Sequence, residues 1–395
     1  MRRYSILVLL LFNSFGLFAS YSTPMRIGLF VNQLPGKAVF SVKSGSFTVY
    51  GDGSPVFDFK GKSLLVLDSK NGRVEVKNYS RSYGLFSKVE IKQKHEGSIY
   101  AIKPVIPSME ERQYTGTLEA TSVGGKIKMI SVVSLPDYVA GVVQSEAGNG
   151  HKPEFYKAQA IISRTYALKH INRFLKYGYN LCDRVNSQVY KTRGYNDTII
   201  EAVKATRDIV LVDADINLIT AAFHSNSGGT TLNSEDVWSG ALPYLRGVED
   251  TFSYCMPHYE WEKTVSKDKF WSFFKMYSTV DLNNREVRHS ILSHCPVNKE
   301  LYFFPADSSL PLKSMRNYFG LNSIDFCLEP QADSVTFIGR GFGHAVGLSQ
   351  EGAMHMAGLG YGYREILNHY YQNVHLIKKS VIDFFRGEET VSNPF

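Results

Sequence analysis

The stretch from Ser134 to Gly150 reads SLPDYVAGVVQSEAGNG and marks the place where the pattern of the chain changes. Ser134 is a favoured N-cap residue type, with Asp137 three positions later as in a capping box. Apolar residues then recur at the spacing of one helical face, at Leu135, Tyr138, Val139, Val142 and Val143. The glycines at 148 and 150 end the pattern. The spacing therefore predicts a helix that begins near Ser134 and stops before Gly148.

The same spacing continues onto Glu146, which puts a carboxyl group on the apolar face of this helix. Burial and the negative end of the helix dipole both raise the pKa of a carboxyl group in that place. A general acid that works near neutral pH needs a raised pKa. The alternative is a glutamate at a helix end that points to solvent or pairs with a lysine.

Before this helix, from Met25 to about Val133, the sequence predicts short strands. Turn signals such as Asn71-Gly72 separate them. The predicted strands include 26–31, 38–43, 47–50, 63–67 and 88–92. We interpret this region as a β domain that packs or binds and carries no chemistry.

After the first helix, the pattern predicts a second helix from Pro153 to about Tyr177, with Gly178 as its stop. Residues 209–212 and 218–223 resemble a hairpin, and 224–229 form a polar, glycine-rich turn. The segment 251–333 is irregular and aromatic and is interpreted as an insertion. A strand over 334–338, a glycine loop over 339–347 and a helix over 349–356 follow. The predicted fold class is α+β, with a β-rich N-terminal region before a mixed α/β domain that has a ligand-binding groove.

The first residues have the layout of a secretory signal. Arg2 and Arg3 precede an apolar run from Ile6 to Phe12, and small residues follow at Ala19 and Ser20. The apolar run is shorter than the roughly 20 residues of a spanning helix, so we expect residues 1–20 to direct export, the alternative being an uncleaved membrane anchor. The expected location is the periplasm or cell envelope.

The balance of charge argues against a nucleic-acid-binding protein. The chain has 44 Lys plus Arg against 37 Asp plus Glu, and the first 19 residues hold two arginines and no acid. The exported part would carry a net charge of +5, which is too mild for a nucleic-acid-binding surface. Aromatic residues make up 13% of the chain, enough to line a groove for a sugar or a peptide.

The cysteines and the known short motifs predict no cofactor or metal. Cys182, Cys255, Cys295 and Cys327 allow three disulfide pairings in an exported protein, and the sequence leaves the choice among them open. Three of the four lie within 255–327, which allows a bridge in that stretch but does not establish one. No C-x-x-C or H-E-x-x-H is present to predict zinc. The loop at 339–347 lacks the third glycine of a dinucleotide-binding motif and the Lys-Ser/Thr of a phosphate-binding loop.

Several polar residues outside the first helix are candidates for a site, each with a structural alternative. Arg164 could orient a carboxylate such as Glu146 or form an ordinary salt bridge. His224 beside Ser225 could form a dyad or a ligand-binding edge, or could be held by simple hydrogen bonds. The loop glycines let backbone N–H groups approach a ligand, with polar contacts from His344, Ser349 and Gln350. A tight turn built for packing is the alternative for that loop.

Four separated blocks of these residues resemble the stage II sporulation protein D family, also called the SpoIID/LytB domain. The blocks appear in the family's order and cover most of 111–260 and 334–378. They are Leu135–Val143 with Ser145-Glu146, Lys157–Ala160 and Arg164–Leu168; Cys182-Asp183 with Gln188–Tyr190; Phe223–Gly229; and Gly339–Gln350 with Gly352-Ala353.

The resemblance implies cell-wall chemistry, because well-understood family members are lytic transglycosylases of peptidoglycan glycan strands. The residue that matches the catalytic glutamate is Glu146. The resemblance places Arg164, His224, Ser225, His344, Ser349 and Gln350 as candidates for lining the glycan groove. Some members hold zinc through a second cysteine shortly after the match to Cys182, but Ser187 stands in that region here, so we expect no metal.

We therefore expect an exported protein with a signal at 1–20, a β-rich domain at 25–133 and a catalytic domain at 134–380 with an insertion at 251–333. Its expected activity is lytic transglycosylase cleavage of denuded strands, in division, sporulation-like development or wall turnover. The resemblance also implies an amidase partner that removes stem peptides. Two alternatives stay open: a noncatalytic wall-binding enhancer of an amidase, and a hydrolysing muramidase.

Overall fold

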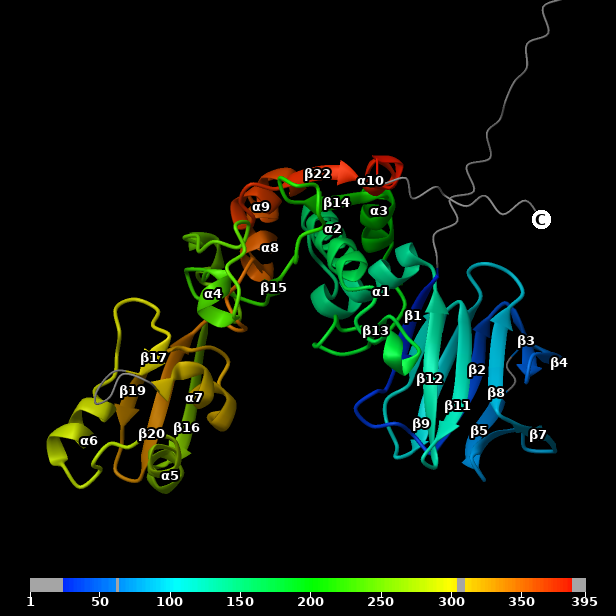
Figure 1. Cartoon of the computed structure of the whole chain (residues 1–395), viewed down its shortest axis with the longest axis horizontal. Helices are drawn as coiled ribbons and strands as arrows, with labels where there is room; N and C mark the ends of the chain where they lie inside the picture. Colours follow the sequence, from blue (N-terminus) through cyan, green and yellow to red (C-terminus); the bar gives the residue numbers. More distant parts are fainter. Residues whose placement is uncertain (1–23, 62–63, 304–309, 386–395) are drawn as a thin grey trace, which may run out of the picture.

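A computed structural model describes residues 24–61, 64–303 and 310–385 of the 395-residue chain. The predicted export signal lies outside the described residues. Figure 1 shows a β sandwich on one side, a second β-containing region on the other, and helices between them. This arrangement confirms the predicted α+β class with a β-rich N-terminal region.

The N-terminal region, here called the sandwich, holds two sheets. One has the strand order β13-β1-β12-β11-β8-β3-β4, and the other has the order β10-β9-β2-β5-β6-β7. The strands are β1 (Met25–Leu29), β2 (Lys37–Ser44), β3 (Ser46–Gly51), β4 (Ser54–Lys60), β5 (Leu64–Lys70), β6 (Arg73–Lys77), β7 (Ser82–Phe86), β8 (Lys88–Gln93), β9 (Ile99–Ile106), β10 (Arg112–Thr115), β11 (Thr117–Val123), β12 (Lys126–Val133) and β13 (Leu181–Cys182).

The sequence explains these strands well. In β3 buried and half-buried residues alternate, with Phe47 and Val49 pointing into the core. The predicted turn at Asn71-Gly72 joins β5 to β6, and both residues have positive φ, 52° and 72°. A two-residue hairpin turn of this kind needs positive φ at both positions, which Asn and Gly tolerate best.

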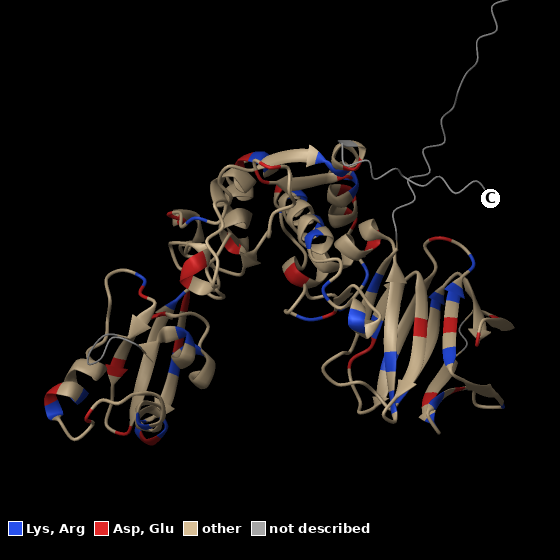
Figure 2. Ribbon diagram, viewed as in Figure 1, with Lys and Arg blue, Asp and Glu red and all other residues tan. Residues whose placement is uncertain are grey.

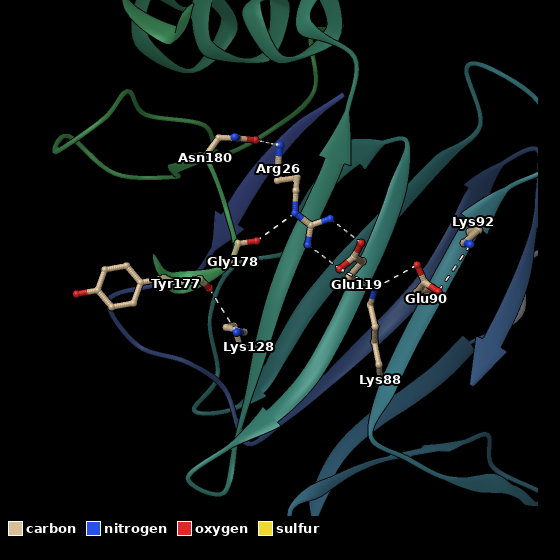
Figure 3. Close-up of polar contacts among 9 residues, drawn as sticks. All are labelled: Arg26, Lys88, Glu90, Lys92, Glu119, Lys128, Tyr177, Gly178 and Asn180. Carbon is tan, nitrogen blue, oxygen red and sulfur yellow. Dashed lines mark hydrogen bonds and ion pairs between the residues drawn. The ribbon is translucent and has the colours of Figure 1, made fainter. Parts of the chain in front are cut away.

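β13 is not part of the N-terminal sequence, yet it completes the first sheet. It pairs in parallel with β1, Ile27 opposite Leu181 and Gly28 opposite Cys182. Figure 3 shows further ties near this edge: the Arg26 guanidinium donates to the carbonyl oxygen of Gly178 at 3.0 Å, and Asn180 Oδ1 accepts from the Arg26 backbone at 2.7 Å. The sandwich is therefore joined to the chain that follows the second helix.

The middle of the molecule is mainly helical. Its elements are α1 (Leu135–Ala147), α2 (Pro153–Lys169), η1 (Leu175–Tyr177), α3 (Asp197–Ala205), β14 (Ile209–Val212), β15 (Phe223–His224), α4 (Ser234–Val237), η2 (Thr251–Ser253), β21 (Leu348–Ser349), α8 (Gln350–Gly358), α9 (Tyr363–Tyr370), β22 (His375–Lys378) and α10 (Lys379–Phe385). One hydrophobic cluster runs from the sandwich into these helices and includes Tyr114 of β10 and Tyr138 of α1. In the part of the chain that the structure describes, no helix is both long and apolar enough to cross a membrane.

Two local predictions in this part were wrong. The second helix ends at Lys169, and the predicted stop Gly178 instead follows the short 3-10 helix η1, with φ 85°. The predicted hairpin is reduced to a single bridge between Val212 and Leu218, because β14 pairs along its length with β22 near the end of the chain. In the second place, pairing with a distant strand decides the structure.

The described part of the segment interpreted as an irregular insertion, residues 251–303 and 310–333, forms regular helices and strands. With the predicted strand at 334–338, it makes up a unit that we call the inserted subdomain, residues 260–303 and 310–340. Its elements are β16 (Glu260–Ser266), α5 (Lys267–Tyr277), α6 (Arg285–Leu292), β17 (Tyr302–Phe303), β18 (Leu310–Pro311), α7 (Leu312–Phe319), β19 (Asp325–Pro330) and β20 (Ser334–Arg340). Its three-stranded sheet, in the order β16-β20-β19, packs around an aromatic core of its own. Many of the described aromatic residues of this segment therefore build a core, while others, such as Tyr277 and Tyr302, are exposed.

Charges of both signs are interspersed through the sandwich, the helical part and the inserted subdomain (Figure 2). On the sandwich, Glu119 of β11 pairs with Arg26 of β1 across the intervening strand β12 at 2.8 Å, and with Lys88 of the neighbouring strand β8 at 3.2 Å. Figure 3 shows this row of ion pairs on the outer face of the sheet.

Candidate active site

Helix α1 begins and ends where the sequence predicts. The Ser134 hydroxyl accepts a hydrogen bond from the Asp137 backbone at 3.2 Å, which caps the first turn. At the other end the Gly148 N–H donates to the Gln144 carbonyl oxygen, and Gly148 has φ 68°. Glu146 therefore lies in the last turn of the helix, where it is half-buried.

One hydrogen bond fixes the Glu146 carboxyl group. Its Oε1 accepts from the Val189 backbone N–H at 2.7 Å. Burial raises the pKa of Glu146 above its ordinary value, while the Val189 bond and the nearby Lys191 charge oppose the rise. This agrees with the raised pKa expected from the sequence. Among the charges that act on this carboxyl in the described structure, none belongs to another acid.

The segment between β13 and α3, here called the 183–196 loop, wraps the end of α1. Besides Val189, the Lys191 N–H donates to the Ser145 hydroxyl at 3.0 Å, and the Asn196 N–H donates to Gln144 Oε1 at 3.1 Å. Three consecutive residues of the last turn of α1, 144 to 146, thus each accept a backbone N–H from the loop. These bonds give the carboxyl a fixed position on the helix.

Gly141 lets the loop come this close. A Cβ atom at this position would lie 2.4 Å from Cε2 of Tyr190 and 2.5 Å from the carbonyl oxygen of Thr192. Both distances are well below van der Waals contact, so a larger residue would push the loop away from the helix.

The structure places Arg164 away from Glu146. Its guanidinium is buried and donates to the carbonyl oxygens of Ile209 at 2.9 Å and Val203 at 3.4 Å. It therefore ties α2 to β14 and α3. Burial lowers the pKa of Arg164 to about 10. These contacts do not support the expected role in orienting the carboxylate of Glu146.

The structure brings His224 and His344 together, with ring centroids 5.4 Å apart. His224 Nδ1 lies 3.2 Å from the Val346 carbonyl oxygen, while His344 Nδ1 accepts from the Val346 N–H at 3.0 Å. Burial lowers the pKa of both rings, that of His344 to about 4. Both imidazoles are therefore neutral near pH 7.

The remaining candidates support the same loops. The Ser349 hydroxyl accepts from the N–H groups of Ser227 at 3.2 Å and Gly352 at 3.3 Å, and so caps α8. Gln350 is buried and its amide lies 3.4 Å from that of Gln159 in α2. The Ser225 carbonyl oxygen accepts from the Glu351 N–H. In the described part of the chain, no hydrogen bond or ion pair links Glu146 to any of the six other candidates.

The segment that forms this site is also where the chain matches a known family. The family model described as "Stage II sporulation protein" matches residues 123–212, which contain α1, α2 and the 183–196 loop. Stage II sporulation protein D of Bacillus amyloliquefaciens is 32% identical over 259 residues, which is 61% of this chain and 74% of the relative. This chain belongs to the stage II sporulation protein D family. The membership gives it a cell-wall-related function.

Two further relatives come from Bacillus subtilis (strain 168). Its stage II sporulation protein D is 29% identical over 300 residues, 71% of this chain and 86% of the relative. Its protein named "Amidase enhancer" is 27% identical over 284 residues, 58% of this chain and 39% of the relative. This chain is thus similar to proteins that carry two different names.

The zinc site that some members of the family have does not fit the residues present here. Cys182 is buried, and its sulfur lies 3.4 Å from the hydroxyl of Ser187, which stands where a second cysteine would be needed. No group of three or more metal-binding side chains gathers anywhere in residues 24–61, 64–303 and 310–385. Of the other cysteines, Cys295 and Cys327 form a disulfide, which settles the pairing that the sequence left open for these two residues.

Sequence reasoning gave no role to the residues that contact Glu146. Val189 lies between Gln188 and Tyr190 in one of the blocks that resemble the family. Its place in that block is the sequence signal that points to a role for it. The Tyr138 hydroxyl also lies at this site, 3.4 Å from Gln188 Oε1, although the helical pattern treated Tyr138 as core alone.

Proposed function

We propose that this protein is a peptidoglycan lytic transglycosylase with Glu146 as its general acid and base. The observation that carries the proposal is the Glu146 carboxyl: burial raises its pKa, one oxygen is fixed by Val189, and its last helical turn is held by the 183–196 loop. A carboxyl group that keeps its proton toward neutral pH is suited to protonate a leaving group.

In the proposed reaction, protonated Glu146 gives its proton to the glycosidic oxygen between N-acetylmuramic acid and N-acetylglucosamine. The bond from that oxygen to muramyl C1 breaks, and N-acetylglucosamine leaves with a free hydroxyl group. The muramyl 6-oxygen then bonds to C1 while Glu146 takes the proton of the 6-hydroxyl. The product is a 1,6-anhydro end, no water is consumed, and Glu146 regains its proton.

This route needs one carboxyl group, whereas ordinary glycosidases need two. The environment of Glu146 supports it, because Lys191 supplies the charge near the carboxyl and no second acid among the described residues contributes to its pKa. Export is part of the proposal. The Cys295–Cys327 disulfide supports export, because disulfides persist in oxidising compartments outside the cytosol.

The test compares wild-type protein with Glu146→Gln on purified glycan strands, with and without stem peptides, and identifies the new ends by mass spectrometry. Glutamine keeps an oxygen for the Val189 N–H but cannot donate a proton as an acid. Anhydro ends from the wild type alone are expected, with denuded strands preferred. Reducing ends would mean hydrolysis, and intact strands would contradict the enzyme proposal.

The similarity to the protein named "Amidase enhancer" favours one alternative, a noncatalytic enhancer of an amidase. The two proposals differ in their dependence on Glu146. Stem-peptide release by an added amidase can be measured with the wild type and with Glu146→Gln. Equal enhancement by both proteins, without anhydro ends, would select the alternative.

A further inference from the structure

The 183–196 loop contacts α1 on one side and the sandwich on the other. On the sandwich side its first residue, Asp183, is 6% exposed. Its Oδ2 accepts from the Phe30 backbone N–H and from the Arg112 guanidinium, both at 2.7 Å. The Asp183 N–H donates to the Gly28 carbonyl oxygen at 3.0 Å. Through its carboxylate and its backbone N–H, Asp183 is therefore fixed to Arg112 of β10, to Gly28 of β1 and to Phe30 just after β1.

A second set of contacts holds the far part of the loop to the same strand β10. The Arg193 N–H donates to the Gln113 carbonyl oxygen at 2.7 Å. Between the two ties, the Tyr190 ring lies 5.3 Å from the ring of Tyr114 and 5.1 Å from that of Tyr138 in α1. The residues that bond to Glu146 and Ser145, at 189 and 191, therefore lie between two points fixed to the sandwich.

Arg112 is suited to fix this geometry. It forms an ion pair with Asp183, and its guanidinium also stacks on the Phe30 ring at 4.3 Å from the centroid. Phe30 has φ 54°, and its N–H is the one that Asp183 accepts. The planar guanidinium thus locks Asp183 and the end of β1 together.

We propose that Arg112 and Asp183 are positioning residues for Glu146, through which the sandwich holds the 183–196 loop and with it the reacting carboxyl group. This inference rests on the proposed function of Glu146, and it gives the β-rich domain a part in the chemistry. Neither residue touches the reacting atoms; both act through the Val189 N–H.

The effect on Glu146 follows from the groups around it. Among the described residues, the titratable side chains that face it are Lys191 from the loop and Tyr138 from α1. Burial raises the pKa of Glu146, while the Val189 bond and the Lys191 charge lower it. Loosening the loop disturbs all three influences, so the pKa of Glu146 changes and the carboxyl moves out of place. Misplacement of a reacting group by about 1 Å can cost up to about a hundredfold in rate.

The test variant is Asp183→Asn, which keeps the size of the side chain and an oxygen for the Phe30 N–H but removes the charge that pairs with Arg112. The matched control is Glu119→Gln, which removes the carboxylate of the bidentate pair with Arg26 in the same sandwich (Figure 3). That pair does not contact the 183–196 loop in the described structure.

We expect Asp183→Asn to lower kcat on denuded strands about tenfold or more with little change in KM. The upper limb of its pH profile and the carboxyl titration of Glu146, followed by carbon NMR and assigned with Glu146→Gln, should both shift away from those of the wild type, and in the same direction as each other. Glu119→Gln should match the wild type. A wild-type titration curve in Asp183→Asn would overturn the inference.

Two arms keep the outcome clear. If Asp183→Asn does not fold, Arg112→Lys keeps the positive charge but loses the planar stacking, and the inference expects it to lie between wild type and Arg112→Ala in both kcat and titration. If the wild type cleaves no strands, the proposed function fails, whereas the NMR titration still decides whether the sandwich positions Glu146.

Discussion

The sandwich and the inserted subdomain are both built on mainly antiparallel sheets and flank the helical part on opposite sides, yet they are joined to it differently (Figure 1). The sandwich shares one hydrophobic cluster with α1 and α2, and takes β13 into its sheet. The inserted subdomain has a separate core and a disulfide of its own. A shared core transmits small displacements, so only the sandwich is expected to influence Glu146.

The inserted subdomain is tied to the helical part by a few polar contacts. Lys299 donates to the carbonyl oxygens of Ser227 at 2.5 Å and Thr230 at 2.7 Å. His258, just before the subdomain, lies 2.6 Å from the Glu351 carboxylate. These contacts reach the turn that follows His224 and the start of α8 next to Ser349, and none of them reaches the 183–196 loop. The comparison thus predicts different consequences for damage to each unit.

The largest expected effect comes from Gly141→Ala. Alanine favours a helix by about 1 kcal/mol over glycine, but its Cβ would meet Tyr190 and Thr192 at less than 3 Å. The 183–196 loop must then move away from α1, and we expect strand cleavage to fall by about tenfold to a hundredfold. Initial rates on denuded strands measure this.

The control for that prediction is Gly358→Ala at the end of α8, where a Cβ atom meets nothing within 4 Å. Its activity should equal that of the wild type, with stability unchanged or slightly raised. An active Gly141→Ala protein would show that close contact of the loop is not required at Glu146.

The next effect concerns the disulfide. Its cysteines are 32 residues apart, and removing a disulfide that closes a loop of that size lowers the free energy of unfolding by about 3–4 kcal/mol. In a Cys295→Ser, Cys327→Ser protein we expect faster proteolysis and hydrogen exchange within 260–340, with unchanged exchange in the sandwich. Cleavage of strands by Glu146 should persist. A matching loss of activity would contradict the separation of the two units.

The smallest effect is the dependence of stability on pH at Glu146. The folded protein raises the pKa of this carboxyl above the ordinary 4.5. Between the unfolded and the folded pKa, the folded state therefore binds more protons than the unfolded state. The contribution of Glu146 to the free energy of unfolding is present below the unfolded pKa and is lost as the pH rises through the folded pKa. Glu146→Gln does not titrate. We expect its unfolding free energy, relative to wild type, to rise on the order of 1 kcal/mol between pH 4 and pH 8.

Urea unfolding of both proteins across this pH range measures the difference. Glu286 on the exposed start of α6 provides the matched control as Glu286→Gln, since its side chain lies on the surface of the inserted subdomain. A difference of the same size and sign at both positions would show that burial of Glu146 is not its cause.

Local patterns predicted the local structure. The apolar spacing and the caps fixed α1 to within a residue, and Glu146 followed from that spacing because a helix is a regular object. The strands of the sandwich and the Asn71-Gly72 turn follow from alternation and turn chemistry for the same reason. Predictions made from sequence were sound where neighbours in the chain are also neighbours in space.

The remaining features depend on distant partners. The Val189 N–H lies 43 residues from Glu146, and no periodicity connects a loop to a helix at that separation. Arg164 bonds to carbonyl oxygens that any sequence would supply, so its partners leave no trace in side-chain pattern. The hairpin expected at 209–223 does not form, because β14 pairs with β22 instead. That partner lies near the end of the chain, so the local pattern at 209–223 could not reveal it.

Strand β1 has a consequence for the order in which the protein can fold during synthesis. It lies between β12, which ends at Val133, and β13, which ends at Cys182. The earliest strand of the described chain therefore waits, with one side unpaired, until more than 150 further residues have been made. Such pairings are slow and leave strand edges open to aggregation. If the chain crosses a membrane before it folds, this sheet can be completed only after both β1 and β13 have crossed.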